Sequence, residues 1–151
     1  MYRISEASIP TESRPGHVAM FAGFGEDVSS VMKGWRANPV PFDTIFNQSK
    51  STFAWGSPDI LQLFSSSTKF KSFQYPAELE DFSKANADFL DTWVLDEFRE
   101  FMKTSKIQDI EKSGTIFFLH LLGSDTNGHT HKPSSNQYRN NVKARIFKFS
   151  I

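Results

Sequence analysis

Apolar side chains recur at steps of three and four residues between Asn86 and Met102, the spacing that gathers them on one face of a helix. Acidic side chains fill the opposite face, and we expect that face to lie in solvent. The apolar positions are Phe89, Leu90, Trp93, Val94, Phe98, Phe101 and Met102, and the acidic ones are Asp88, Asp91, Asp96, Glu97 and Glu100. The pattern predicts an amphipathic helix over residues 86–102.

A continuous apolar run with no helical period extends over Thr115–Leu122 and has a glycine on each side. Its length and the two glycines favour a strand buried on both faces, as in a parallel sheet. His120 lies inside this run, where we expect a core histidine with a hydrogen-bond partner. A shorter run, Thr52–Trp55, predicts a second strand, which the following Gly-Ser-Pro sequence ends.

Shorter helical segments stand between and before these strands. Small apolar residues from Pro15 to Ala22, followed by Gly23, predict a buried helix with a glycine at its end. Residues 65–76 show no clear period, and residues 35–41 read as a loop. The other predicted helical segments are residues 26–32, 42–47 and 59–64. Helices that alternate with strands favour an α/β fold.

Composition limits the partners that this chain can bind. The 151 residues form one domain with a core rich in its 16 phenylalanines. Lysine plus arginine and aspartate plus glutamate both number 17, so no net charge attracts nucleic acid, and we expect none as a partner. The absence of cysteine excludes a disulfide framework and a cysteine-based zinc site. No apolar run approaches the roughly 20 residues that span a bilayer, and the N-terminus is too polar for a signal peptide.

Candidate chemistry begins in the segment Ile9–His17, which places hydroxyl groups just before a predicted helix. Pro15 suits the first turn of a helix, so Ser13 is expected at or beside the N-cap. The free backbone N–H groups there, together with the positive end of the helix dipole, stabilise a phosphate. The alternative is an ordinary serine cap followed by a surface histidine, His17.

A second group of polar residues, Gly123–His131, follows directly after the predicted buried strand. In open α/β sheets, ligands collect at the carboxyl ends of strands. Asp125, His129 and His131 lie there, and an Asp-x-x-x-His pair offers zinc an oxygen and an imidazole nitrogen. The alternative is a plain turn, because Asn127-Gly128 is itself a strong turn signal.

Short motifs follow one another in a fixed order over residues 9–143. They are Thr11–Gly23, Glu26–Ser29, Gly34-Trp35, Asn38-Pro39, Phe42-Asp43, Trp55–Ile60, Asp91–Val94, Phe118–Gly123, Asp125–His129 and Pro133–Ser135. This ordered set resembles the GPI ethanolamine phosphate transferases of the alkaline phosphatase superfamily. The resemblance implies an incomplete alkaline-phosphatase-like α/β fold, with a mostly parallel sheet and flanking helices. The domain that it implies comprises residues 1–143, and residues 144–151 form a divergent tail.

The resemblance also implies roles for single residues. Ser13 corresponds to the nucleophile that attacks phosphorus, with Thr11 as the alternative. Asp125 and His129 correspond to zinc ligands in a site that holds two zinc ions in the whole family. Candidate contacts to substrate or its phosphate are Arg14, His17 and His131, although Arg14 equally suits a plain surface position. Asn47 begins an Asn-Gln-Ser sequon, a candidate glycosylation site in a luminal chain.

The reaction implied is the transfer of phosphoethanolamine from phosphatidylethanolamine to the first mannose of the GPI-anchor precursor. Diacylglycerol leaves as Ser13 takes the phosphoethanolamine, and a mannose hydroxyl then accepts it. Such enzymes act on the luminal side of the endoplasmic reticulum membrane. Their membrane region lies outside the part that this chain resembles.

The chain departs from the family pattern in its metal ligands. No aspartate precedes Ser13, and residues 138–151 contain neither an acid nor a histidine to complete the zinc pair. We therefore expect a fragment that by itself is poorly soluble and without transferase activity. The alternative is a truncated product that only binds a partner or a lipid head group. A Ser-His-Asp hydrolase is disfavoured because Gly-x-Ser-x-Gly is absent.

Overall fold

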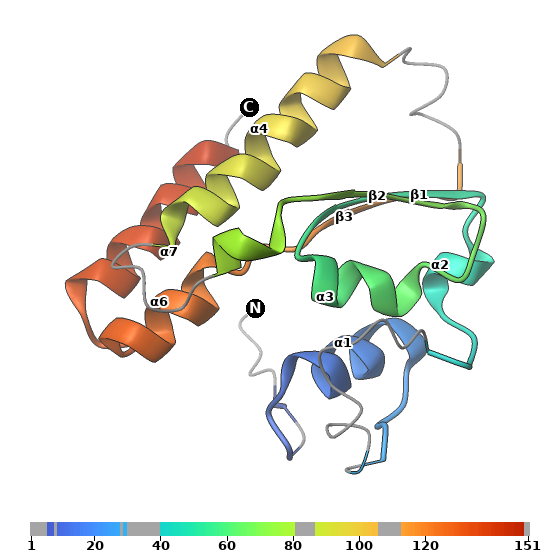
Figure 1. Cartoon of the computed structure of the whole chain (residues 1–151), viewed down its shortest axis with the longest axis horizontal. Helices are drawn as coiled ribbons and strands as arrows, with labels where there is room; N and C mark the ends of the chain where they lie inside the picture. The colour runs from blue at the N-terminus through green and yellow to red at the C-terminus, as the bar shows by residue number, and fades with distance from the viewer. Residues whose placement is uncertain are drawn as a thin grey trace, which may run out of the picture.

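The structure, a computed structural model, describes residues 6–7, 9–27, 29, 40–80, 87–105 and 113–149, with side chains up to residue 144. Figure 1 shows how these segments are arranged. Their elements in chain order are α1 (Ser13–Ala22), α2 (Ile45–Gln48), β1 (Ser51–Gly56), α3 (Pro58–Leu61), η2 (Gln62–Phe64), β2 (Phe70–Gln74), η3 (Ala77–Glu80), α4 (Asp88–Thr104), β3 (Thr115–Leu119), α6 (Gly123–His131) and α7 (Asn136–Phe149).

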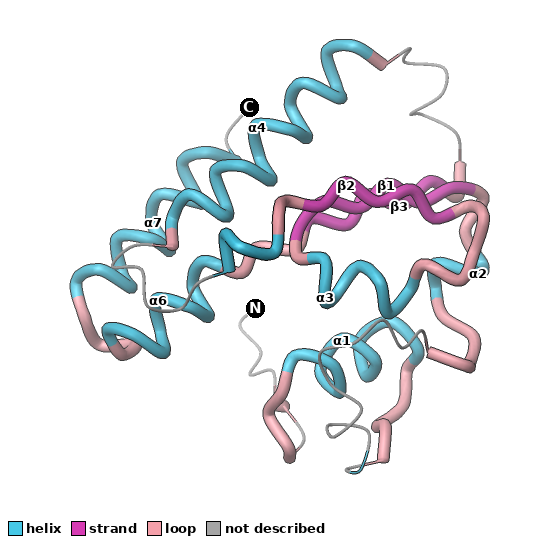
Figure 2. Tube along the Cα trace, viewed as in Figure 1, coloured by secondary structure: helices cyan, strands magenta, loops and turns pink. Residues whose placement is uncertain are grey.

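Three parallel strands form the sheet, in the order β2-β1-β3. Thr52 of the central strand lies opposite Phe70 on one side and Ile116 on the other. Helices α1, α2 and α3 lie on one side of the sheet and α4 on the other, as Figures 1 and 2 show. This arrangement confirms the expected α/β fold with a parallel sheet and flanking helices. In the described part of the chain, no helix is both long enough and apolar enough to cross a bilayer.

Two apolar clusters pack on the sheet, one with each layer of helices. Successive residues of β1 point to opposite faces of the sheet and so belong to different clusters. Ala54 packs with Val18 and Phe46, whereas Trp55 packs with Leu90 of α4. All of these side chains are buried. Each fully buried large apolar side chain contributes roughly 1.5–3 kcal/mol, so the two clusters hold the three layers together.

The predicted helices over residues 15–22 and 86–102 are confirmed as α1 and α4, with small changes of boundary. Gly23 ends α1 in the left-handed region, with φ of 80°, a conformation in which glycine carries no steric cost. The predicted segments 42–47 and 59–64 correspond to α2 and to α3 with η2. Most of the predicted helix over residues 26–32, most of the loop over 35–41 and residue Asn86 lie outside the described residues.

Strand β3 corrects one prediction. It ends at Leu119, and each of its residues is half-buried rather than buried on both faces. The reason is its position, because in the described sheet β3 pairs with β1 alone. Strand β2 was not predicted, since its residues, Phe70–Gln74, are largely exposed and lack an apolar period.

The ends of β1 and β3 meet at Gly56, whose φ is 143°. A Cβ atom on this residue would lie 2.7 Å from His120 Cβ and 2.8 Å from the His120 carbonyl oxygen. The backbone N–H of His120 donates to the Trp55 carbonyl oxygen at 2.9 Å, which closes the contact. His120 is 8% exposed, which confirms its core position. Its ring Nδ1 has no hydrogen-bond partner among the described residues, so the expected partner is not found there.

Candidate functional site

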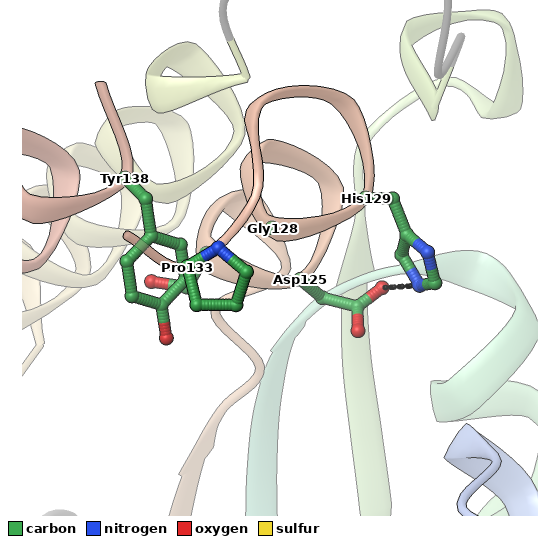
Figure 3. A pocket seen from close by; sticks show the side chains of 6 residues that line it. Asp125, Gly128, His129, Pro133 and Tyr138 are labelled. Carbon is green, nitrogen blue, oxygen red and sulfur yellow. Dashed lines mark ion pairs between the residues drawn. The ribbon is translucent and has the colours of Figure 1, made fainter. Parts of the chain in front are cut away.

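Asp125 and His129 lie on a helix, α6, and not in the plain turn that Asn127-Gly128 offered as the alternative. They are one turn apart, and Asp125 Oδ2 lies 3.7 Å from His129 Nε2. The Asp125 side chain is 51% exposed and that of His129 is 71% exposed. Figure 3 shows both side chains on the same side of α6, where they can contact one ligand. His131 is the last residue of this helix.

A buried polar network fixes α6 against α4. Asp91 Oδ1 accepts the Gly123 N–H at 2.8 Å, and Asp91 Oδ2 accepts from the Asn141 side chain at 3.3 Å. Asn141 and Asn127 both donate to Asp88 Oδ1. The prediction of a solvated acidic face is therefore wrong at Asp91, which is 3% exposed, and at the half-buried Asp88. It is confirmed at the three remaining positions, Asp96, Glu97 and Glu100.

Gly123 is the point where α6 begins and where it comes closest to α4. A Cβ atom here would collide with the Asp91 carboxylate and lie 2.8 Å from the Ala87 carbonyl oxygen. Only a residue without a side chain leaves room for the hydrogen bond from its N–H to Asp91. The network therefore sets the position from which α6 presents Asp125 and His129.

We expect Asp91→Ala to lower the free energy of unfolding by about 2 kcal/mol, because the buried Gly123 N–H loses its acceptor. The network would no longer hold the start of α6. Urea unfolding followed by circular dichroism measures the change. Asp96→Ala on the exposed face of α4 is the control, since it removes only a surface pair with Arg99 and should change stability by less than about 0.5 kcal/mol. Equal losses in both variants would contradict a role for the network.

Ser13 is the first residue of α1, with Glu12 as its N-cap, as the sequence predicted for a serine beside the cap. Its side chain is exposed, and in the described part of the chain its hydroxyl makes no hydrogen bond. The hydroxyl therefore lies at the positive end of a ten-residue helix without being used as a cap. Thr11 is also exposed, two residues before the helix begins.

Arg14 does not lie on the surface, which corrects one of its two predicted positions. It is 7% exposed, because its guanidinium binds the Glu26 carboxylate through Nε at 2.9 Å and Nη2 at 2.7 Å. This ion pair ties the start of α1 to the segment after it. A contact between Arg14 and phosphate stays a prediction.

His17 is fixed one turn after Ser13. Its Nδ1 donates to the Ser13 carbonyl oxygen at 2.7 Å, and since a carbonyl only accepts, Nδ1 carries the proton and Nε2 is free to accept. Burial lowers the pKa of His17. Its ring contacts His120 with centroids 4.9 Å apart, and burial, with a smaller contribution from His17, lowers the pKa of His120 to about 3. Both imidazoles are therefore neutral at pH 7.

Among the described residues, no hydrogen bond joins Ser13 to the Asp125–His129 pair. In Figure 1 the helices that carry them, α1 and α6, are separate elements. Asn47 lies half-buried in the short helix α2, so its sequon is part of a folded turn.

Asp125 and His129 fit two positions of a zinc site. Zinc–oxygen and zinc–nitrogen distances of about 2.0–2.2 Å place two such ligand atoms about 3.4 Å apart in tetrahedral geometry. The observed separation of 3.7 Å is close to that value. The described residues supply no group of three or more histidine, aspartate or glutamate side chains that could hold a metal ion. Zinc binding by this pair therefore stays a prediction.

Sequence reasoning missed the pocket beside this pair. It measures about 480 Å³ and is lined by Ser124, Asp125, Gly128, His129, Pro133 and Tyr138. Figure 3 shows Pro133 and Tyr138 on the side of the pocket opposite Asp125 and His129. The signal that could have found it is the motif Pro133–Ser135, which follows the Asp-x-x-x-His pair at a short distance.

The chain is similar to proteins named GPI ethanolamine phosphate transferase 1. It is 51% identical to the one from Homo sapiens and 49% to the one from Mus musculus over 93% of its length, and 47% to the one from Saccharomyces cerevisiae over 94%. The chain spans 16% of the length of each of these curated relatives. No protein-family pattern matches the chain, and no solved structure does. The identities confirm the resemblance seen in the ordered motifs and show homology to one segment of these proteins.

Proposed function

We propose that this chain forms part of an enzyme that transfers phosphoethanolamine from phosphatidylethanolamine to the first mannose of the GPI-anchor precursor. The observation that supports the proposal is the identity of 45–51% with proteins named GPI ethanolamine phosphate transferase 1, over 93–94% of the chain. The aligned region is long enough to include both candidate groups, around Ser13 and around Asp125. Support also comes from the exposed hydroxyl at the start of α1 and the paired Asp125 and His129 on α6.

In the proposed reaction, Ser13 Oγ loses its proton and forms a bond to phosphorus. The bond from phosphorus to the diacylglycerol oxygen breaks, and diacylglycerol leaves as an alcohol. A mannose hydroxyl then attacks the same phosphorus, and Ser13 recovers its hydroxyl. The N–H groups in the first turn of α1 stabilise the negative phosphoryl oxygens next to Ser13.

Asp125 and His129 are proposed to hold a zinc ion together with ligands from other parts of the whole protein. Zinc, when bound, stabilises a deprotonated hydroxyl and neutralises phosphoryl charge. His17, His131 and Arg14 remain candidates for contacts to phosphate or substrate. The proposal includes the luminal side of the endoplasmic reticulum membrane as the place of action, the compartment in which an Asn47 sequon can be glycosylated.

A chimera tests this function. The matching segment of the Saccharomyces cerevisiae relative is replaced by this chain, and membranes that contain the chimera receive labelled phosphatidylethanolamine and mannosylated GPI precursor. We expect labelled phosphoethanolamine on the precursor, because the chain would supply the same site as the segment it replaces. The relative without the segment and the isolated chain serve as controls, and neither should transfer label. A chimera present at the level of the relative but without transfer would contradict the proposal.

A further inference from the structure

The pocket beside the Asp125–His129 pair has two different walls. One wall carries the carboxylate and the imidazole of that pair, and the other is formed by the Pro133 ring and the aromatic ring of Tyr138, as Figure 3 shows. The pocket measures about 480 Å³ and is a shallow depression, largely open to solvent. A ligand in this pocket would lie between the aromatic ring and the candidate metal ligands.

Tyr138 is held as a fixed platform. It lies on α7, and its backbone N–H donates to Ser135 Oγ at 3.1 Å. The edge of its ring packs over Gly128, where a Cβ atom would lie 3.5 Å from Tyr138 Cε2. Tyr138 is half-buried, and Figure 3 shows its ring beside that of Pro133.

The lining decides which part of the two substrates fits. No lysine or arginine lines the pocket, so a phosphate in it would have only the proposed zinc ion as a cationic partner. An ammonium group needs a carboxylate that binds no other cation, and the Asp125 carboxylate is already proposed to bind zinc. Acyl chains need a wall of apolar side chains, whereas here only Pro133 and Tyr138 are apolar or aromatic. A sugar ring fits, because its C–H face carries partial positive charge that the negative face of an aromatic ring attracts, while its hydroxyls bond to polar groups.

We infer that this pocket binds the mannose ring of the acceptor, with Tyr138 stacked against the sugar; the inference rests on the proposed function. The Tyr138 hydroxyl can donate to or accept from the sugar hydroxyls, and Ser124 Oγ, which donates to Asn141 Oδ1 at 2.9 Å, can accept from them. The accepting hydroxyl then points toward Asp125 and His129. Tyr138 is thereby a specificity-determining residue for the acceptor and has no role in cleavage of the lipid donor.

The experiment separates the two half-reactions of the chimera. Donor cleavage is measured as diacylglycerol released from phosphatidylethanolamine without acceptor, and transfer is measured over a range of mannosylated precursor. Tyr138→Ala should raise the KM for the acceptor about tenfold and leave donor cleavage unchanged. Tyr138→Phe should keep the acceptor KM within about threefold, since the ring remains. Gln137→Ala, an exposed neighbour on α7 that does not line the pocket, is the matched control.

Tyr138→Leu tests whether the effect on the acceptor KM comes from lost packing alone. Leucine keeps an apolar side chain against Gly128 but has no aromatic face. This variant should raise the acceptor KM as Tyr138→Ala does. The inference is overturned if Tyr138→Leu keeps the acceptor KM of the parent chimera, or if loss of the ring slows donor cleavage as much as transfer. A parent chimera with no transfer at all would instead count against the proposed function.

Discussion

Replacement of Ser13 by alanine in the chimera is expected to lower phosphoethanolamine transfer about a thousandfold or more. The proposed reaction passes through a bond between Ser13 Oγ and phosphorus, and alanine has no atom to form that bond. The effect should fall on the rate of both half-reactions, because donor cleavage and transfer share the serine intermediate. Initial rates of diacylglycerol release and of label transfer measure it.

Thr11→Ala is the matched comparison, since Thr11 is the alternative nucleophile two residues away and is equally exposed. This variant should retain at least about a third of the parent rate. The Thr11 hydroxyl that it removes lies before the helix, outside the electric field of the N–H groups in the first turn of α1. The reverse result, with Thr11→Ala inactive and Ser13→Ala active, would move the role of nucleophile to Thr11.

Gly56→Ala should destabilise the chain by about 3 kcal/mol or more, the largest effect on stability that we expect from a single methyl group. The backbone at Gly56 has a φ of 143°, which residues with a side chain rarely adopt. The new Cβ would also press against both Cβ and the carbonyl oxygen of His120, and a carbonyl in a paired backbone cannot move aside. Thermal unfolding followed by circular dichroism gives the loss.

Gly25→Ala provides the control for that measurement. A Cβ atom at Gly25 would have no neighbour within 4 Å among the described residues, and its backbone is not in the left-handed region. This variant should unfold within a few degrees of the parent chain. A Gly56→Ala chain as stable as Gly25→Ala would show that the ends of β1 and β3 are not held together as tightly as the structure indicates.

Periodicity predicted those elements that bury one clear apolar face. Helix α4 follows this rule, whereas β1, which packs on both faces of the sheet, was predicted from its short apolar run and the Gly-Ser-Pro sequence after it; both were predicted close to their observed boundaries. Helix α6 has almost no apolar face, and its Asn127-Gly128 pair reads locally as a turn. It is helical because Asp91 accepts the N–H at its start and Asn127 bonds across to α4. Those contacts join residues more than 30 positions apart, and no local pattern contains them.

The candidate site was predictable in its parts and not in its assembly. The spacing of Asp125 and His129 predicted a pair, and the structure places the two side chains together. Proline after Ser13 predicted the helix start, and α1 begins there. Arg14 reads as a surface residue until its partner is known, because Glu26 is distant enough in sequence that no local pattern links them. Tyr138 was missed since one aromatic residue in a polar segment carries no period.

The close contact between Gly123 and Asp91 restricts how this region can change during evolution. The glycine has no space for a side chain, its N–H depends on the Asp91 carboxylate, and Asn141 depends on that same carboxylate. A single substitution at any of the three leaves a buried group unpaired or creates a clash, so each position is tolerable only with its present neighbours. Another combination of residues at these positions is tolerated only when two or three of them change together. The three positions should therefore vary as a unit among homologues, even though none of them belongs to the Asp125–His129 pair that they support.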